Sequence, residues 1–158
     1  MTAAPLKEEK KSVIGQETAK PILFVCTGNT CRSPMAEAMY EALSGQKDSA
    51  LSAGIFPAVG EPVSENAIAA LEKRGIDCQK AKSRGAVRAD AFLLERCERA
   101  VAMTASHAMM LMSEYPQYAS KIFSMPTDIP DPFGGDEAAY EACLSKIEEG
   151  LRALFPLS

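Results

Sequence analysis

Short apolar runs alternate with segments of helical periodicity along most of the chain. Residues 22–25 (Ile-Leu-Phe-Val) follow Pro21 and precede a loop of Thr, Gly and Asn residues, as is typical of a buried strand in a parallel sheet. Three further runs predict strands at 50–53, 99–103 and 121–125. Apolar residues spaced three or four apart predict helices at 33–45, 64–75, 89–96, 104–112 and 136–154. This alternation indicates an α/β fold with a parallel sheet, whose ligands bind beyond the carboxyl ends of the strands.

Hydroxyl and glycine residues mark the expected helix ends. Ser33 stands before Pro34, and a hydroxyl at the N-cap with proline in the first turn favours a helix start there. Ser64 and Thr104 are expected to cap two later helices in the same way. Gly45 is placed to end the first helix, because glycine adopts the left-handed backbone that often follows the last turn.

The composition fits one globular domain and excludes several classes of protein. Of the 158 residues, 47% are apolar, which is enough for a buried core. The net charge of −4 disfavours a nucleic-acid binder, and no apolar run approaches the ~20 residues of a membrane helix. Residues 1–20 are polar, lack periodicity and lack the apolar stretch of a secretory signal. We therefore expect a flexible extension at 1–20, a domain at 21–158, a cytoplasmic location, and neither nucleic-acid nor membrane partners.

The five cysteines form neither a disulfide framework nor a zinc pattern. Their number is odd, no Cys-x-x-Cys pair occurs, and the chain has one histidine, so we expect no metal and no other cofactor. Cys97 and Cys143 are expected to be small core residues. His107 follows a predicted strand at the start of a helix, where a structural role is expected.

The loop after the first strand carries the chemistry that stands out. It runs from Cys26 to Ser33 and has the form Cys-x5-Arg-Ser, with Arg32 as its arginine. The spacing alone is weak evidence, because Cys78 and Arg84 repeat it. That second pair follows no apolar strand, has no glycine between its members and leads into no hydroxyl residue. We therefore place the site at the first loop.

The first loop has the properties of an oxyanion site. A loop that opens a helix directs several backbone N–H groups at one point, and the helix dipole adds positive potential there. Arg32 is suited to grip two oxygens of a phosphoryl group, and the same field favours the thiolate of Cys26. Ser33 is placed to donate to the Cys26 sulfur, and Asn29 tolerates a left-handed backbone. The loop residues expected to surround the phosphate are Thr27, Gly28, Asn29, Thr30, Cys31 and Ser33.

Four segments together resemble the low-molecular-weight protein tyrosine phosphatase family. They are residues 24–37 (Phe-Val-Cys-Thr-Gly-Asn-Thr-Cys-Arg-Ser-Pro-Met-Ala-Glu), 51–54, 101–104 with His107 after it, and 131–133 (Asp-Pro-Phe). The resemblance covers roughly residues 21–155. It implies a single α/β domain with a four-stranded parallel sheet flanked by helices on both faces.

The resemblance also implies roles for individual residues. Cys26 matches the nucleophile, Arg32 the phosphate clamp and Asp131 the general acid, whereas Asn29, Ser33 and Ser52 match residues that hold the loop in shape. Cys31 is either a spectator thiol or a partner that forms a reversible disulfide with Cys26. The implied reaction is hydrolysis of a phosphorylated protein side chain through a phosphocysteine, with inorganic phosphate as product.

Two features separate the chain from the tyrosine-specific pattern. Thr30 stands where tyrosine-specific members usually have a larger aliphatic residue, and Phe133 is followed by two glycines rather than a second aromatic. Both features resemble the protein-arginine phosphatase branch, so Thr30 and Phe133 are the expected selectivity residues. Phosphoarginine is the favoured substrate and phosphotyrosine the alternative. Two further alternatives are an arsenate reductase, which needs two more relay cysteines, and a phosphocysteine carrier, which needs no general acid.

Overall fold

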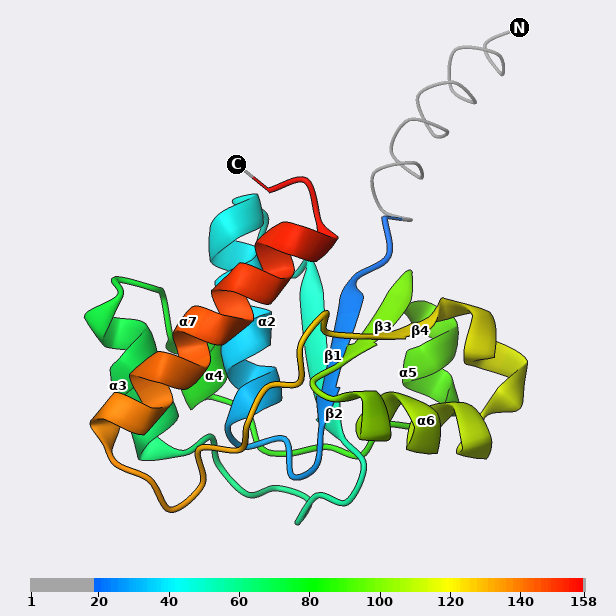
Figure 1. The fold of residues 1–158 in the computed structure, drawn as a ribbon, viewed down its shortest axis with the longest axis horizontal. Helices are drawn as coiled ribbons and strands as arrows, with labels where there is room; N and C mark the ends of the chain where they lie inside the picture. The colour runs from blue at the N-terminus through cyan, green and yellow to red at the C-terminus, as the bar shows by residue number, and fades with distance from the viewer. Residues whose placement is uncertain (1–18, 158) are drawn as a thin grey trace, which may run out of the picture.

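The computed structural model describes residues 19–157, and most of the predicted extension at 1–20 lies outside them. Four strands form one parallel sheet in the order β2-β1-β3-β4 (Figure 1). The strands are β1 (Ile22–Cys26), β2 (Ala50–Gly54), β3 (Arg99–Ala102) and β4 (Ile122–Ser124). The fold class and the four-stranded parallel sheet implied by the sequence are confirmed.

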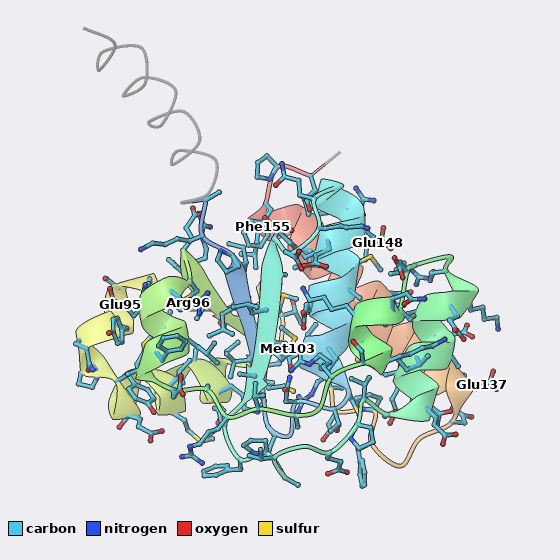
Figure 2. All side chains as sticks on the ribbon, turned by 180° about the vertical axis from the view of Figure 1, so that it is seen from behind. Glu95, Arg96, Met103, Glu137, Glu148 and Phe155 are labelled. Atoms are coloured by element: carbon cyan, nitrogen blue, oxygen red, sulfur yellow. The ribbon has the colours of Figure 1, made fainter. Side chains whose placement is uncertain are left out.

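Helices cover both faces of the sheet (Figure 1). They are α2 (Arg32–Ser44), α3 (Glu65–Lys73), α4 (Gln79–Lys82), α5 (Ala91–Arg96), α6 (Ala105–Glu114), the 3-10 helix η1 (Pro116–Lys121) and α7 (Glu137–Leu154). The face covered by α2, α3, α4 and α7 carries the larger of two hydrophobic clusters, and α5 and α6 cover the other. Met103 after β3 and Phe155 after α7, both labelled in Figure 2, belong to the larger cluster.

The two clusters follow from the alternation of side chains along β1. Ile22, Phe24 and Cys26 belong to the larger cluster, and Leu23 and Val25 belong to the smaller one. All five are buried, because successive residues of a strand point to opposite faces and helices cover both. This explains why the first strand is a continuous apolar run.

Several predicted boundaries differ from the structure. The helix α2 begins at Arg32 with Cys31 at its N-cap, so the expectation that Ser33 is the N-cap is wrong. The helix expected at 89–96 begins at Ala91, because the Asp90 side chain accepts from the Leu93 amide and caps it there. The last strand begins only at Ile122. Neither the four-residue helix α4 nor the 3-10 helix η1 was predicted from the sequence.

The other helix ends are confirmed. Ser64 accepts from the Ala67 amide and Thr104 from the His107 amide, as expected for N-caps. Gly45 has a φ of 72° and ends α2 in the left-handed region. Within residues 19–157, no helix combines the length and the apolarity that crossing a membrane would need.

Candidate active site

The phosphate loop, residues 27–31 between β1 and α2, coils around the sulfur of Cys26. Asn29 has a φ of 59°, a left-handed backbone, and its amide donates to Cys26 Sγ at 3.3 Å. The loop carbonyls face outward: Thr27 O accepts from the Phe56 amide and Thr30 O from the Ser64 amide, both at 2.9 Å. Since a planar peptide points its N–H and C=O in opposite directions, this leaves loop N–H groups facing inward. Such an arrangement favours an anion at its centre.

A chain of polar side chains lies behind the sulfur. Cys26 Sγ lies 2.9 Å from Ser33 Oγ, and Asn29 Nδ2 donates to both Ser33 Oγ at 2.9 Å and Ser52 Oγ at 3.0 Å. Asn29, Ser33 and Ser52 are buried, at 1%, 0% and 3% exposure, so these hydrogen bonds are shielded from water. The structure thus brings together the three residues that the resemblance assigned to loop support.

Arg32 lies beside the loop with its guanidinium held in a fixed position. Its Nη1 donates to the Ile129 carbonyl at 2.9 Å and its Nη2 to Thr27 Oγ1 at 3.4 Å. Nη2 also lies 3.7 Å from Asp131 Oδ2. The Arg32 side chain is 7% exposed and the Asp131 side chain 54%, so the guanidinium is buried and the carboxyl stands at an open position.

The structure distinguishes Asp131 from its neighbour Asp128. Asp131 Oδ1 accepts from the Phe133 amide at 3.0 Å, which fixes the carboxyl near Arg32. Asp128 Oδ1 instead accepts from the Ala105 amide at 2.9 Å, at the start of α6. Of these two carboxyls, therefore, Asp131 is the one that pairs with Arg32.

His107 contacts the phosphate loop, which its sequence context did not indicate. Its Nε2 lies 2.7 Å from Thr27 Oγ1 and its Nδ1 lies 3.0 Å from Thr104 Oγ1. Burial and the nearby Arg32 charge lower the pKa of His107, against the opposing effect of Asp128 and Asp131. His107 therefore links the N-cap of α6 to the loop, a structural role that also bears on the site.

Cys31 faces the C-terminal helix. Its sulfur lies 3.4 Å from the hydroxyl of Tyr140, and both Cys26 and Cys31 are free thiols. Cys143, one turn along α7, is buried in the same cluster, and burial raises its pKa to about 12. The expectation that Cys97 and Cys143 are core residues is confirmed by their burial.

Arg84 is the main residue of the site that sequence reasoning missed. Its Nη2 donates to Asn29 Oδ1 at 2.7 Å, and its Nη1 donates to Ser52 Oγ and Glu37 Oε1, each at 2.6 Å. The Cys-x5-Arg spacing drew attention to Arg84 only as the partner of Cys78. Nothing in the local sequence indicates that it reaches a loop more than fifty positions earlier.

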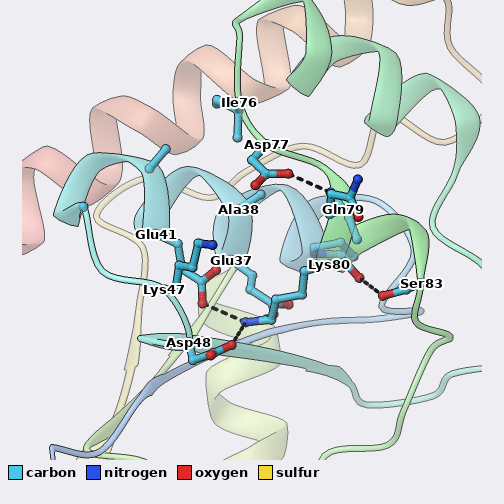
Figure 3. Close-up of a pocket in the computed structure, with 14 residues that line it drawn as sticks. Glu37, Ala38, Glu41, Lys47, Asp48, Ile76, Asp77, Gln79, Lys80 and Ser83 are labelled. Atoms are coloured by element: carbon cyan, nitrogen blue, oxygen red, sulfur yellow. Dashed lines mark hydrogen bonds and ion pairs between the residues drawn. The ribbon is translucent and has the colours of Figure 1, made fainter.

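A cavity of about 600 Å³ lies between α2 and α4 (Figure 3). Lys80 crosses it, with its Nζ 2.7 Å from Glu41 Oε2 and 3.0 Å from Glu37 Oε2. The latter contact lies outside hydrogen-bond geometry, so Glu37 Oε2 accepts no hydrogen bond from the described residues. The cavity is lined by Glu37 but by none of Cys26, Arg32 or Asp131, so it is not the phosphate site.

The predicted selectivity residues lie on the loops of the site. Thr30 is half-buried in the phosphate loop, and the Phe133 ring, two residues after Asp131, is 81% exposed. Phe56, which the sequence did not single out, is also largely exposed and is anchored by its amide to Thr27 O. The site therefore presents two exposed rings next to loops that carry the reactive groups.

A shielded sulfur inside a loop of inward amides, beside a fixed guanidinium and an open carboxyl, defines a cysteine-dependent phosphatase. The sequence profile of the family described as low molecular weight phosphotyrosine protein phosphatase matches residues 21–157. The chain belongs to this family, and the family and enzyme class expected from the sequence are confirmed.

Three known proteins illustrate the similarity. A protein-arginine-phosphatase of Bacillus subtilis is 34% identical over 143 residues, 84% of this chain and 93% of the relative. A solved YwlE arginine phosphatase, a cysteine-to-serine mutant with a phosphorylated active-site serine, has a TM-score of 0.77 at 32% identity and covers 85% of this chain and 92% of its own. An arsenate reductase of Bacillus cereus is 32% identical and covers 86% of this chain and 94% of its own length.

The structure gives no relay for arsenate reduction through Cys78 and Cys97. Cys78 belongs to the hydrophobic cluster of α2, α3 and α7, and Cys97 to the cluster on the opposite face of the sheet. A disulfide requires Cα atoms within about 7 Å of each other. The sheet lies between these two thiols, so they are not placed to pass a disulfide from one to the other.

Proposed function

We propose that this chain hydrolyses phosphoarginine in proteins, with Cys26, Arg32 and Asp131 as its catalytic residues. The observation that supports the catalytic assignment is the meeting of these residues from β1, α2 and the 131–133 segment at one loop. Arg32 Nη2 lies 3.7 Å from Asp131 Oδ2, and Cys26 lies inside the loop that Arg32 borders.

The proposed first step is in-line attack of the Cys26 thiolate on phosphorus. The S–P bond forms while the P–N bond of phosphoarginine breaks, and Asp131 donates a proton to the leaving guanidine nitrogen. Arg32 and the loop amides stabilise the charge on the transferring oxygens, which supplies the largest share of the catalysis.

The second step returns the enzyme to its starting state. Asp131, now a carboxylate, takes a proton from water as that water attacks the phosphocysteine. The S–P bond breaks, inorganic phosphate leaves, and the Cys26 thiolate reforms with the Ser33 hydroxyl as its hydrogen-bond donor at 2.9 Å.

The preference for phosphoarginine rests on Thr30 and Phe133. Thr30 gives the loop a hydroxyl where an apolar wall would suit a tyrosine ring, and a phosphoguanidinium is polar at its reactive end. Phe133 exposes its ring and is suited to cover a planar guanidine. The protein-arginine-phosphatase of Bacillus subtilis supports the same assignment. Phosphotyrosine is the second candidate, because the family itself is described as acting on it.

The deciding experiment compares kcat/KM on peptides of one sequence that carry phosphoarginine or phosphotyrosine. We expect a higher value for phosphoarginine; an equal or higher value for phosphotyrosine would contradict the proposed substrate. Cys26→Ser is the control and should abolish turnover of both peptides while retaining binding of inorganic phosphate. Normal turnover by this variant would contradict the assignment of the nucleophile.

Cys31 is proposed as the redox partner of Cys26. Its thiol contacts Tyr140 in the reduced protein, so forming the disulfide requires the side chain to turn away from α7. Oxidation with hydrogen peroxide followed by peptide mapping tests this: a Cys26–Cys31 linkage that dithiothreitol reverses is expected. Over-oxidised Cys26 without a linkage would leave Cys31 as a spectator.

A further inference from the structure

Arg84 meets the phosphate loop at the side-chain oxygen of Asn29. It comes from the segment after α4, and its side chain is 19% exposed. Its two terminal nitrogens donate to the side chains of three residues, namely Asn29, Ser52 and Glu37, and Nη2 also donates to the Ser52 and Gly85 carbonyls. Because arginine offers only donors, each of these contacts fixes which atom of the partner accepts.

The contact with Asn29 fixes the direction of its side-chain amide. The oxygen Oδ1 faces two donors, Arg84 Nη2 at 2.7 Å and the Val87 amide at 3.0 Å. The Asn29 nitrogen must therefore face the other way, toward Ser33 and Ser52. With the amide reversed, its nitrogen would face two donors and both hydrogen bonds would be lost.

The orientation of the Asn29 amide in turn decides which groups the hydroxyls of Ser33 and Ser52 donate to. Ser52 Oγ receives hydrogen bonds from Asn29 and Arg84, so its own hydrogen goes to Glu37 Oε1 at 2.6 Å. Ser33 Oγ receives one from Asn29, which leaves its hydrogen for Cys26 Sγ at 2.9 Å or the more distant Ala53 carbonyl at 3.4 Å. Asn29 and Ser33 therefore donate in turn toward the sulfur, whereas Ser52 donates to Glu37.

We propose that Arg84 is a positioning residue that orients the Asn29–Ser33 chain and so keeps a hydrogen-bond donor directed at the Cys26 thiolate. Glu37, with a side chain 5% exposed, balances the charge of Arg84 at 2.6 Å. An ammonium group is a single compact donor head and does not span Asn29, Ser52 and Glu37 as the planar guanidinium does. The inference rests on the proposed phosphatase function but concerns the state of the thiol itself.

The test measures the reactivity of the Cys26 thiol and does not depend on turnover of a substrate. The pH dependence of alkylation by iodoacetamide, mapped to Cys26 by mass spectrometry, reports how readily the thiolate forms. Arg84→Ala should move the midpoint upward by about one pH unit, the size expected from weakening one hydrogen bond to a charged group. The Val87 amide remains as a donor to Asn29, so a partial loss is expected. On phosphorylated peptides, kcat should fall about tenfold with a smaller change in KM.

Arg88→Ala is the matched control. Arg88 lies on the same segment, but its side chain is 49% exposed and its ion pair with Glu114 is 3.6 Å long. The control should keep the wild-type midpoint. Coincident midpoints for Arg84→Ala, Arg88→Ala and wild type would overturn the proposal, as would equal upward shifts in both variants.

A second variant covers the case in which Arg84→Ala does not fold. Arg84→Lys keeps a positive charge beside Glu37, and we expect it to fold and to shift the midpoint in the same direction by a smaller amount. A wild-type midpoint in Arg84→Lys would overturn the requirement for a guanidinium. A shifted midpoint in a protein that hydrolyses neither phosphopeptide would support the role of Arg84 and contradict only the proposed substrates.

Discussion

Cys26 Sγ lies 2.9 Å from Ser33 Oγ, and Asn29 donates to that same hydroxyl. The Ser33 hydrogen is thereby directed at the sulfur, where it stabilises the thiolate that leaves in the second step. We predict that Ser33→Ala slows phosphocysteine hydrolysis by about tenfold, the effect of one hydrogen bond to a charged group. A pre-steady-state burst of the dephosphorylated peptide, followed by a slow steady state, should appear. If Ser33→Ala slowed the formation and the hydrolysis of the phosphocysteine by the same factor, Ser33 would act only on the shape of the loop.

Asp131 is placed to protonate the leaving group. Asp131→Asn keeps the size of the side chain and an acceptor for the Phe133 amide, but it removes the acid. We predict a loss of about 10²–10⁴ in kcat/KM, which reports the step that expels the leaving group, with aryl phosphates whose leaving groups are poor, and a much smaller loss in kcat/KM with good ones. Steady-state rates across a series of substituted phenyl phosphates measure this. A loss independent of the leaving group would contradict the acid role.

Thr30 is the proposed selectivity residue of the phosphate loop. Thr30→Ile replaces the hydroxyl with a longer apolar branch, which should favour a tyrosine ring and disfavour a phosphoguanidinium. We predict that the ratio of kcat/KM for phosphoarginine and phosphotyrosine peptides falls by about tenfold, the size of a modest pocket change. Thr30→Ser, which keeps the hydroxyl, is the control. An unchanged ratio in Thr30→Ile would rule out this account of the substrate.

His107 is expected to make the stability of the folded protein depend on pH. Burial lowers its pKa below the ordinary 6.5, so on acidification the unfolded chain binds the proton first. The stability that depends on neutral His107 is present above about pH 6.5 and is lost as the pH falls through the lowered value. We predict that Tm declines less steeply between pH 7 and 5 in His107→Gln than in the wild type. Parallel curves would contradict this.

The titration itself can be followed directly. The chain contains one histidine, so its imidazole protons give a single set of NMR signals. Arg32 on α2 and the two carboxyls Asp128 and Asp131 are the charges that face the ring. The midpoint should lie below 6.5 in the folded protein, and a midpoint above that value would contradict the predicted direction.

Gly54 supports the phosphate loop from β2. A Cβ atom there would lie 2.6 Å from the Thr27 carbonyl oxygen and 3.1 Å from the Asn29 amide nitrogen, both backbone atoms that cannot turn aside. We predict that Gly54→Ala displaces the loop, lowers Tm, and weakens phosphate binding measured by calorimetry. Wild-type binding by this variant would mean that the loop moves freely, contrary to the fixed cradle seen here.

Short-range information was enough for most of the fold. The apolar run at 22–25 gave β1, and the capping residues Ser64 and Thr104 marked the starts of α3 and α6 correctly. The predicted N-cap of α2 was wrong because the Ser33 hydroxyl contacts the Cys26 sulfur instead of a backbone amide of the helix. A rule based on helix-cap preference alone does not weigh this contact, although the two residues are only seven positions apart and the loop motif itself suggested it.

The sequence by itself determined the α/β architecture, the family and the reactive loop, because strand periodicity, the Cys-x5-Arg-Ser motif and the Asp-Pro-Phe segment are local patterns. Only the tertiary structure decided that Arg84 holds Asn29, that His107 touches Thr27, and that Cys78 and Cys97 lie on opposite faces of the sheet. The first two contacts join residues that lie 55 and 80 positions apart in the sequence. The two cysteines look alike in the sequence, but the fold places them on different sides of the sheet. The partners of these residues are chosen by how the helices and loops pack on the sheet, which no local pattern encodes.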